Sequence, residues 1–155
     1  MTLEFRSVGL EQEPARSLLQ GMREEIAVLY DDLDIDAPEM PKAGPTELGP
    51  PRGDFLVGID SEGEGVCCGG IKALTEGACE IKRMYVRPEA RGRGVGGQLL
   101  TALEGRAREL GYSVARLDTG PNQPHSQRLF RAAGYRDIAN FNHNPIATYF
   151  GEKRL

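Results

Sequence analysis

The amino-acid sequence predicts a single α/β domain in which helices flank a mixed central sheet. Short strand-like runs alternate with longer runs whose apolar residues recur at helical spacing. The chain has 155 residues, of which 39% are hydrophobic and 27% charged, a composition typical of a globular protein. This length is enough for one domain with its own core. We therefore expect residues 1–155 to form one domain.

The first half of the chain predicts a strand, a helix and an antiparallel meander. Residues 3–8 alternate in polarity like a strand, and Pro14 begins a helix that continues to Tyr30. Residues 31–52 are acidic and then rich in proline and glycine, so they predict a long loop. This loop is either a substrate lid or a disordered surface segment. Three strands follow at 55–59, 66–74 and 78–86, and glycines in the second one suggest a bulge.

The second half predicts two further helices and three further strands. A helix is expected from Gly94 to Leu110, because apolar residues recur on one face and Gly111 follows. A strand at 114–118 and a short helix that carries Phe130 come next. The tail at 135–155 has room for two strands around an Asn-Pro loop.

The most informative segment lies between the third meander strand and the long second helix. Gly92, Gly94 and Gly96 stand at alternate positions, so the backbone can approach a ligand closely with converging N–H groups. The helix N-terminus adds a partial positive charge, and Arg91 and Arg93 would add charged donors. These features predict an anion site that suits a pyrophosphate. An Arg/Gly-rich surface turn is the alternative.

Charge and composition argue against several other functions. The formal net charge of −4 disfavours nucleic-acid binding as the main function. No apolar run approaches the ~20 residues that a membrane span needs, and the N-terminus lacks the shape of a signal peptide. We therefore expect a cytoplasmic protein without membrane contact. No Lys-Ser or Lys-Thr follows the glycines, which excludes a P-loop, and the cysteines and histidines lack metal-ligand spacing. No metal cofactor is expected.

In its order of motifs, nearly the whole chain resembles the GNAT superfamily of acyl-CoA-dependent N-acyltransferases. Residues 91–96, Arg-Gly-Arg-Gly-Val-Gly, match the family pattern Arg/Gln-x-x-Gly-x-Gly/Ala. The resemblance implies a splayed central sheet, with the CoA pyrophosphate at this loop and the pantetheine arm along the preceding strand. The CoA-binding residues that it implies are Met84, Tyr85, Val86, Arg91, Gly92, Arg93, Gly94, Val95, Gly96, Asn122, Gln123 and Ser126.

A narrower resemblance points to a bacterial subgroup of this superfamily. It rests on Pro-Pro-Arg-Gly at 50–53, Glu-Ile-Lys-Arg-Met-Tyr-Val at 80–86 and Phe-Asn-His-Asn-Pro at 141–145. The resemblance implies transfer of an acetyl group from acetyl-CoA to an amine of a small molecule, by direct attack in a ternary complex. Two alternatives remain, a non-catalytic acyl-CoA-binding or sensing module and transfer to a protein terminus or lysine. The oligomeric state is open, with a homodimer among the options.

Glu80 is the candidate general base, because only a neutral amine can attack the thioester carbonyl. It precedes Arg91 by eleven residues, which resembles the spacing of the catalytic glutamate in several family members. A period of two would place Glu80 on one strand face with Lys82, Met84 and Val86, and would place Arg83 on the other. Alternatively, Glu80 is an ion-pair partner of Lys82 or Arg83. These two cations would also suit an acceptor that carries a carboxylate, or are structural charges.

The chain departs from the family pattern after the glycine loop. Many members have Asn-x-x-Ala followed by a tyrosine that protonates the departing thiolate. Here Asn122 and the residues at 123–126 occupy the first part, and Phe130 stands at the tyrosine position. Since phenylalanine cannot donate a proton, we expect Phe130 to be a core anchor. Either the thiolate leaves unassisted or another donor serves, and the candidates are Tyr85, Tyr135, Ser126 and His125.

Overall fold

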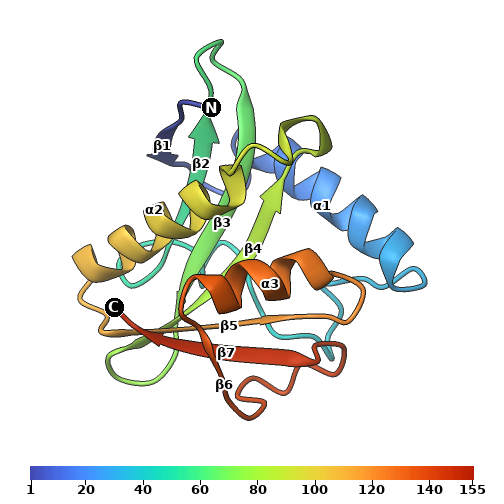
Figure 1. The fold of residues 1–155 in the computed structure, drawn as a ribbon, viewed down its shortest axis with the longest axis vertical. Helices are drawn as coiled ribbons and strands as arrows, with labels where there is room; N and C mark the ends of the chain where they lie inside the picture. The colour runs from blue at the N-terminus through green and yellow to red at the C-terminus, as the bar shows by residue number, and fades with distance from the viewer.

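A seven-stranded mixed sheet in the order β1-β2-β3-β4-β5-β7-β6 organises the chain (Figure 1). The computed structural model describes residues 1–155. Strands β2, β3 and β4 form the antiparallel meander that the sequence predicts, β1 extends it by pairing with β2, and β4 and β5 are the one parallel pair. The strands are β1 (Glu4–Ser7), β2 (Asp54–Ile59), β3 (Gly65–Ala73), β4 (Ala78–Val86), β5 (Val114–Thr119), β6 (Arg136–Asp137) and β7 (Tyr149–Arg154).

Three α-helices cover the sheet, close to where the sequence predicts them. They are α1 (Ala15–Leu29), α2 (Val95–Glu109) and α3 (Pro124–Ala132), and a 3₁₀ turn, η1 (Pro88–Ala90), precedes the glycine loop. Gly111 and Gly134 follow α2 and α3 with φ angles of +96° and +98°, which end both helices. None of the helices is long and apolar enough to cross a bilayer.

The two faces of the sheet bury separate hydrophobic clusters. Leu99 and Leu103 of α2 pack on one face together with Phe130 of α3. Leu18 and Leu19 of α1 pack on the other face. Each fully buried leucine contributes roughly 2 kcal/mol by leaving water. The sheet is thus anchored between α1 on one side and α2 with α3 on the other.

All three cysteines are buried free thiols. Burial raises the pKa of Cys67 to about 11 and that of Cys79 to about 12. The pKa of Cys68 is also raised by burial. None of these thiols is ionised near neutral pH, so none is prepared to act as a nucleophile.

The parallel strands β4 and β5 separate after a short paired segment. Their register joins only residues 78–80 to residues 114–116, although β4 continues to Val86. Figure 1 shows β5 and β7 lying across the direction of β3 and β4. The backbone of β4 after Glu80 therefore has no strand neighbour on the β5 side. This is the splayed sheet that the family resemblance implies.

A bulge interrupts β4 opposite the glycines of β3. Tyr85 pairs with Cys68, whereas Lys82 pairs with Gly70, so β4 holds one more residue than β3 between these pairs. Arg83 lies in this interval with a φ of +58°. A bulge was expected from the β3 glycines, but the extra residue lies in β4 and reverses its alternation.

The bulge changes which β4 side chains share a face. Met84 and Val86 pack under α2, and Tyr85 packs under α1. The expectation that Met84 and Val86 share a face with Glu80 is therefore wrong. Arg83 is not on the far face from Glu80 either, because its guanidinium donates to the carbonyl of Ile35, which packs on the α1 side together with Tyr85.

The long segment at 31–52 contains no helix or strand, as expected, but it is packed against the protein. Ile35, Met40, Ala43 and Leu48 are buried. These contacts hold the loop against the α1 side of the sheet, so the interpretation as a disordered surface segment is wrong.

A buried polar cluster joins α2 to the C-terminal strands. The Tyr135 hydroxyl donates to Glu104 Oε2 at 2.8 Å, and Lys153 Nζ lies 3.1 and 3.0 Å from the two Glu104 oxygens. Burial is the main cause that raises the pKa of Tyr135, and the Glu104 carboxylate adds to it. The cluster lies away from the cavities described below and serves the fold.

Glu104→Gln should lower the free energy of unfolding by about 2 kcal/mol, because the Lys153 ammonium loses its carboxylate. Chemical denaturation measures this loss. Glu109→Gln, on an exposed position of the same helix, is the matched control and should change stability little. Equal losses in the two variants would contradict a stabilising role for the cluster.

Candidate active site

A groove of about 410 Å³ lies where β4 ends and the glycine loop begins. We call it the loop groove. Most of the residues implied to bind CoA line it, and they come from β4, the loop, the start of α2 and the start of α3. These are Met84, Tyr85, Val86, Arg91, Gly92, Gly94, Val95, Gly96, Gln123 and Ser126.

The glycine loop presents unused backbone donors. The N–H groups of residues 92–97 make no hydrogen bond within the chain. Gly92 and Gly94 have φ angles of +78° and +77°, and a Cβ atom at either position would meet no atom within 4 Å. Unused N–H groups at a helix N-terminus form an anion site, and open space at the glycines leaves room for the anion. The loop therefore fits a pyrophosphate.

Two of the predicted polar residues form hydrogen bonds within the chain, and a third is exposed. Arg91 donates to Glu25 Oε1 at 2.7 Å and to the Val86 carbonyl at 2.9 Å, so it ties the loop to α1. Asn122 donates to the last carbonyl of α1 at 2.7 Å. Arg93 is exposed. Neither Arg93 nor Asn122 lines the loop groove.

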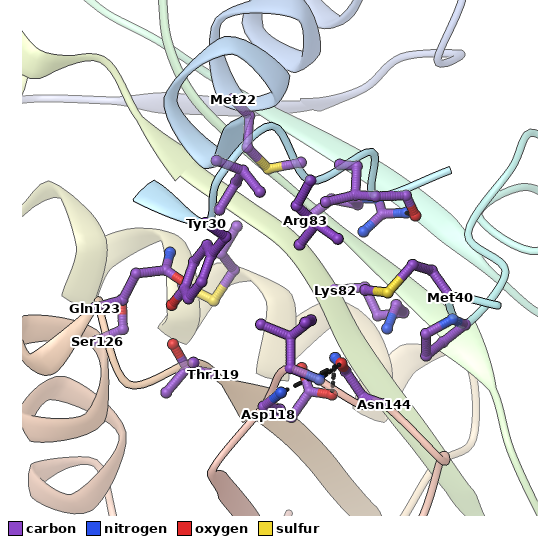
Figure 2. A pocket seen from close by; sticks show the side chains of 18 of the residues that line it. Met22, Tyr30, Met40, Lys82, Arg83, Asp118, Thr119, Gln123, Ser126 and Asn144 are labelled. Atoms are coloured by element: carbon purple, nitrogen blue, oxygen red, sulfur yellow. Dashed lines mark hydrogen bonds between the residues drawn. The ribbon is translucent and has the colours of Figure 1, made fainter. Parts of the chain in front are cut away.

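A second cavity of about 140 Å³ adjoins the loop groove at the splay, and we call it the inner cavity (Figure 2). The two share Met84, Gln123, Ser126 and Phe130. In Figure 2, Gln123 and Ser126 lie at one end, and Lys82 and Met40 at the other. Other walls of the inner cavity come from α1, the 31–52 loop and the segment between β6 and β7. The loop groove and the inner cavity thus lie side by side across these four residues, between the glycine loop and the opened sheet.

Glu80 is fully buried and lines neither cavity. Its Oε2 accepts hydrogen bonds from Lys82 Nζ at 3.0 Å and from Asn142 Nδ2 at 2.8 Å. The ion pair with Lys82, which was the alternative interpretation, is therefore present. Glu80 Oε1 is the one buried side-chain polar atom without a partner in the chain. Direct contact between Glu80 and a molecule in the inner cavity is excluded by this burial.

Residues that the sequence analysis did not select complete the polar network. Asp118 borders the inner cavity from the splayed end of β5, and its Oδ2 accepts from Asn142 Nδ2 at 2.7 Å and Asn144 Nδ2 at 3.0 Å. The dashed lines in Figure 2 include the bond from Asn144. The motif at 141–145 was the available signal, but it identified a subgroup and not a contact.

Phe130 is a core residue at the boundary of both cavities. Its ring centroid lies 6.2 Å from that of Tyr135 in an edge-on arrangement and 6.4 Å from that of Tyr149 in a stacked one. Only 5% of the residue is exposed. The expectation that Phe130 anchors the core is confirmed.

The candidate proton donors differ in whether they line the loop groove or the inner cavity. Ser126 lines both cavities, and Tyr85 and His125 line the loop groove. Tyr135 lines neither, and its hydroxyl already donates to Glu104. The structure therefore leaves Ser126, Tyr85 and His125 within reach of a ligand. No group of three or more His, Cys, Asp or Glu side chains has the geometry to hold a metal ion.

Comparison with known proteins identifies the family to which the chain belongs. The model of the acetyltransferase (GNAT) family matches residues 19–135. An uncharacterised N-acetyltransferase of Schizosaccharomyces pombe is 37% identical over 101 residues, which are 64% of this chain and 62% of that protein. The matched segment thus spans about three fifths of the relative's length.

Solved structures share the fold over almost the full chain. A Klebsiella pneumoniae protein assigned as an acyl-CoA N-acyltransferase superposes with a TM-score of 0.76 at 25% identity, over 99% of this chain and 98% of that one. A GNAT family acetyltransferase from Elizabethkingia anophelis, solved with acetyl-CoA bound, gives 0.67 at 15% identity, over 99% and 98%. With the family match covering most of its length, this chain belongs to the GNAT family of acetyltransferases.

Proposed function

We propose that residues 1–155 act as one N-acetyltransferase domain that transfers the acetyl group of acetyl-CoA to an amine of a small molecule. The observation that carries this proposal is the junction of the loop groove with the inner cavity at the splay. The unused N–H groups of residues 92–97 suit the pyrophosphate, and the backbone at 84–86 suits the pantetheine arm. The volume of the inner cavity suits a small acceptor better than a protein segment.

In the proposed reaction the neutral amine attacks the thioester carbonyl directly. The new C–N bond forms, the C–S bond breaks and the CoA thiolate leaves, while the amine loses a proton. Buried thiols with raised pKa values disfavour a cysteine nucleophile, which supports a ternary complex over an acyl-enzyme.

Glu80 is proposed as the base, acting through a water molecule at Oε1. This oxygen has no partner in the chain, and buried polar atoms normally acquire one from water or a ligand. Asp118 faces the inner cavity and is placed to bind the incoming ammonium. Direct deprotonation by Asp118 is the rival mechanism.

Coenzyme A release with a panel of small amines tests the proposal. Release that depends on an amine supports it. Tight acetyl-CoA binding without release for any amine or peptide would instead favour an acyl-CoA-sensing module. The burial of Glu80 and the phenylalanine at position 130 make that second function worth testing. Release with peptides alone would indicate a protein acceptor.

Phe130→Tyr should change kcat less than about tenfold, because leaving-group protonation does not depend on this position. The added hydroxyl enters an apolar contact between two aromatic rings, so stability should fall by roughly 1 kcal/mol. Steady-state kinetics and thermal unfolding measure the two effects. A large gain in kcat would show that the site is prepared for a tyrosine acid that this protein lacks.

A further inference from the structure

We propose that Arg83 binds a carboxylate of the acceptor, and that the acceptor is an apolar amino acid or a close analogue carrying both amine and carboxylate. This inference rests on the proposed function, because it names the substrate class for the same inner cavity.

The bulge brings Arg83 to the wall of the inner cavity. With regular alternation its side chain would lie on the α2 side with Ile81, but at the bulge, where its φ is +58°, Arg83 reaches the Ile35 carbonyl on the α1 side and lines the cavity there. Figure 2 shows Arg83 and Lys82 on neighbouring parts of the wall. A left-handed backbone is uncommon for arginine, and such strain is often found at functional sites.

Arg83 is the cation of this wall whose charge is least compensated. Lys82 is paired with Glu80 at 3.0 Å. In contrast, Arg83 Nη2 makes only long contacts, 3.3 Å to the Ile35 carbonyl and 3.5 Å to Asp36 Oδ1. Asp36 is also bonded to another arginine at 2.9 Å, and its side chain is 47% exposed. The nearest counter-charge of Arg83 is therefore shared and largely hydrated.

The remaining guanidinium donors of Arg83 are free for a ligand. Nε and Nη1 make no hydrogen bond in the chain. Neither atom is fully buried, so solvent can reach both of them. The side chain as a whole is only 11% exposed, and burial lowers the pKa of the guanidinium. A carboxylate that accepts hydrogen bonds from Nε and Nη1 would replace the hydrogen bonds to water that the guanidinium loses on burial.

The rest of the inner cavity defines the other parts of the acceptor. Asp118 offers a carboxylate to an ammonium group on the β5 side, across the space from the arginine wall in Figure 2. Between these charges the wall is apolar, which suits an aliphatic or aromatic side chain. The apolar residues are Met22, Ile26, Leu33, Ile35, Met40 and Ile146.

The kinetic test uses matched acceptors that differ only in the carboxylate. Leucine is compared with leucinamide and isoamylamine, and the same sets are made for methionine and phenylalanine. We expect kcat/KM to be higher for the amino acid. In the Arg83→Met variant the KM for the amino acid should rise roughly 10- to 100-fold, because charged hydrogen bonds to its carboxylate are lost. The KM values for the amides and amines should change little. Arg83→Lys should fall between.

Arg23→Met is the matched control, because it removes the other arginine bonded to Asp36 and lies outside the inner cavity. Thermal unfolding checks that each variant folds. The acetyl-CoA affinity of Arg83→Met should equal that of the wild type. Equal kcat/KM for amino acid and amide, or the same loss for all acceptors in Arg83→Met, overturns the inference but leaves acetyl transfer intact.

A binding measurement separates this inference from the proposed function. Calorimetry on the CoA-loaded protein compares N-acetyl-leucine, which has a carboxylate, with N-acetyl-leucinamide, which does not. If no acceptor is acetylated but N-acetyl-leucine binds preferentially and needs Arg83, the carboxylate site stands and the transferase proposal fails. If neither turnover nor preferential binding occurs with any set, both fail.

Discussion

Gly94→Val is expected to weaken acetyl-CoA binding about 100-fold or more in a protein that remains folded. The φ of +77° at this position disfavours a β-branched residue, so the loop would have to change conformation. The new side chain would also enter the open space beside the unused N–H groups. Losing two hydrogen bonds to an anion, at about 1.5 kcal/mol or more each, accounts for this factor.

Calorimetry with acetyl-CoA measures the loss, and thermal unfolding shows whether the fold survives. Gly105→Val is the matched control, because it adds the same side chain to α2 where a Cβ atom also meets nothing within 4 Å. Gly105 lies far along the helix from the loop and should leave affinity unchanged. Wild-type affinity in a folded Gly94→Val variant would remove the loop from the CoA site.

Glu80→Gln is expected to lower kcat by roughly 100-fold or more while acetyl-CoA affinity stays nearly constant. The amide keeps the shape of the side chain but cannot accept the proton that the amine loses. Steady-state kinetics with a true acceptor measures kcat, and calorimetry measures affinity. Equal kcat in the two proteins, with chemistry rate-limiting, would leave Glu80 as an ion-pair partner only.

A second variant separates chemistry from stability. Glu80→Gln leaves the buried Lys82 ammonium without its carboxylate, which is expected to cost about 3 kcal/mol of stability. Adding Lys82→Met removes that unpaired charge and should recover stability. If kcat recovers as well, Glu80 acts through the ion pair. If Asp118→Asn abolishes activity while Glu80→Gln does not, Asp118 is the base.

The sequence predicted the elements well because their signals are local. Alternation, helical spacing and the glycines after α2 and α3 identify the three helices and the first five strands within a few residues, whereas the tail at 135–155 was only expected to contain two strands. The bulge in β4 was misplaced because it depends on pairing with β3. Arginine has no intrinsic preference for a positive φ, so nothing in the sequence marks the extra residue at Arg83. Because the bulge was missed there, Met84 and Val86 were assigned to the wrong face of the strand.

In the candidate site, too, the local features could be predicted from the sequence and the long-range contacts could not. The glycine loop was predictable because its donors and its open space come from consecutive residues. The polar network was not, since Asp118 meets Asn142 and Asn144 across sequence separations of 24 and 26 residues. Only the folded sheet brings these side chains together, and no local pattern in the chain encodes their contact.

The splay of β4 from β5 also has an evolutionary consequence. The walls beyond the shared junction come largely from α1, the 31–52 loop and the segment before β7, and of these three segments only α1 also reaches the loop groove, through Glu25. Surface loops tolerate substitution and insertion better than the strands they connect. Changes in the two loops would therefore alter the proposed acceptor site while the glycine loop, which is the proposed site of the acyl donor, stays the same.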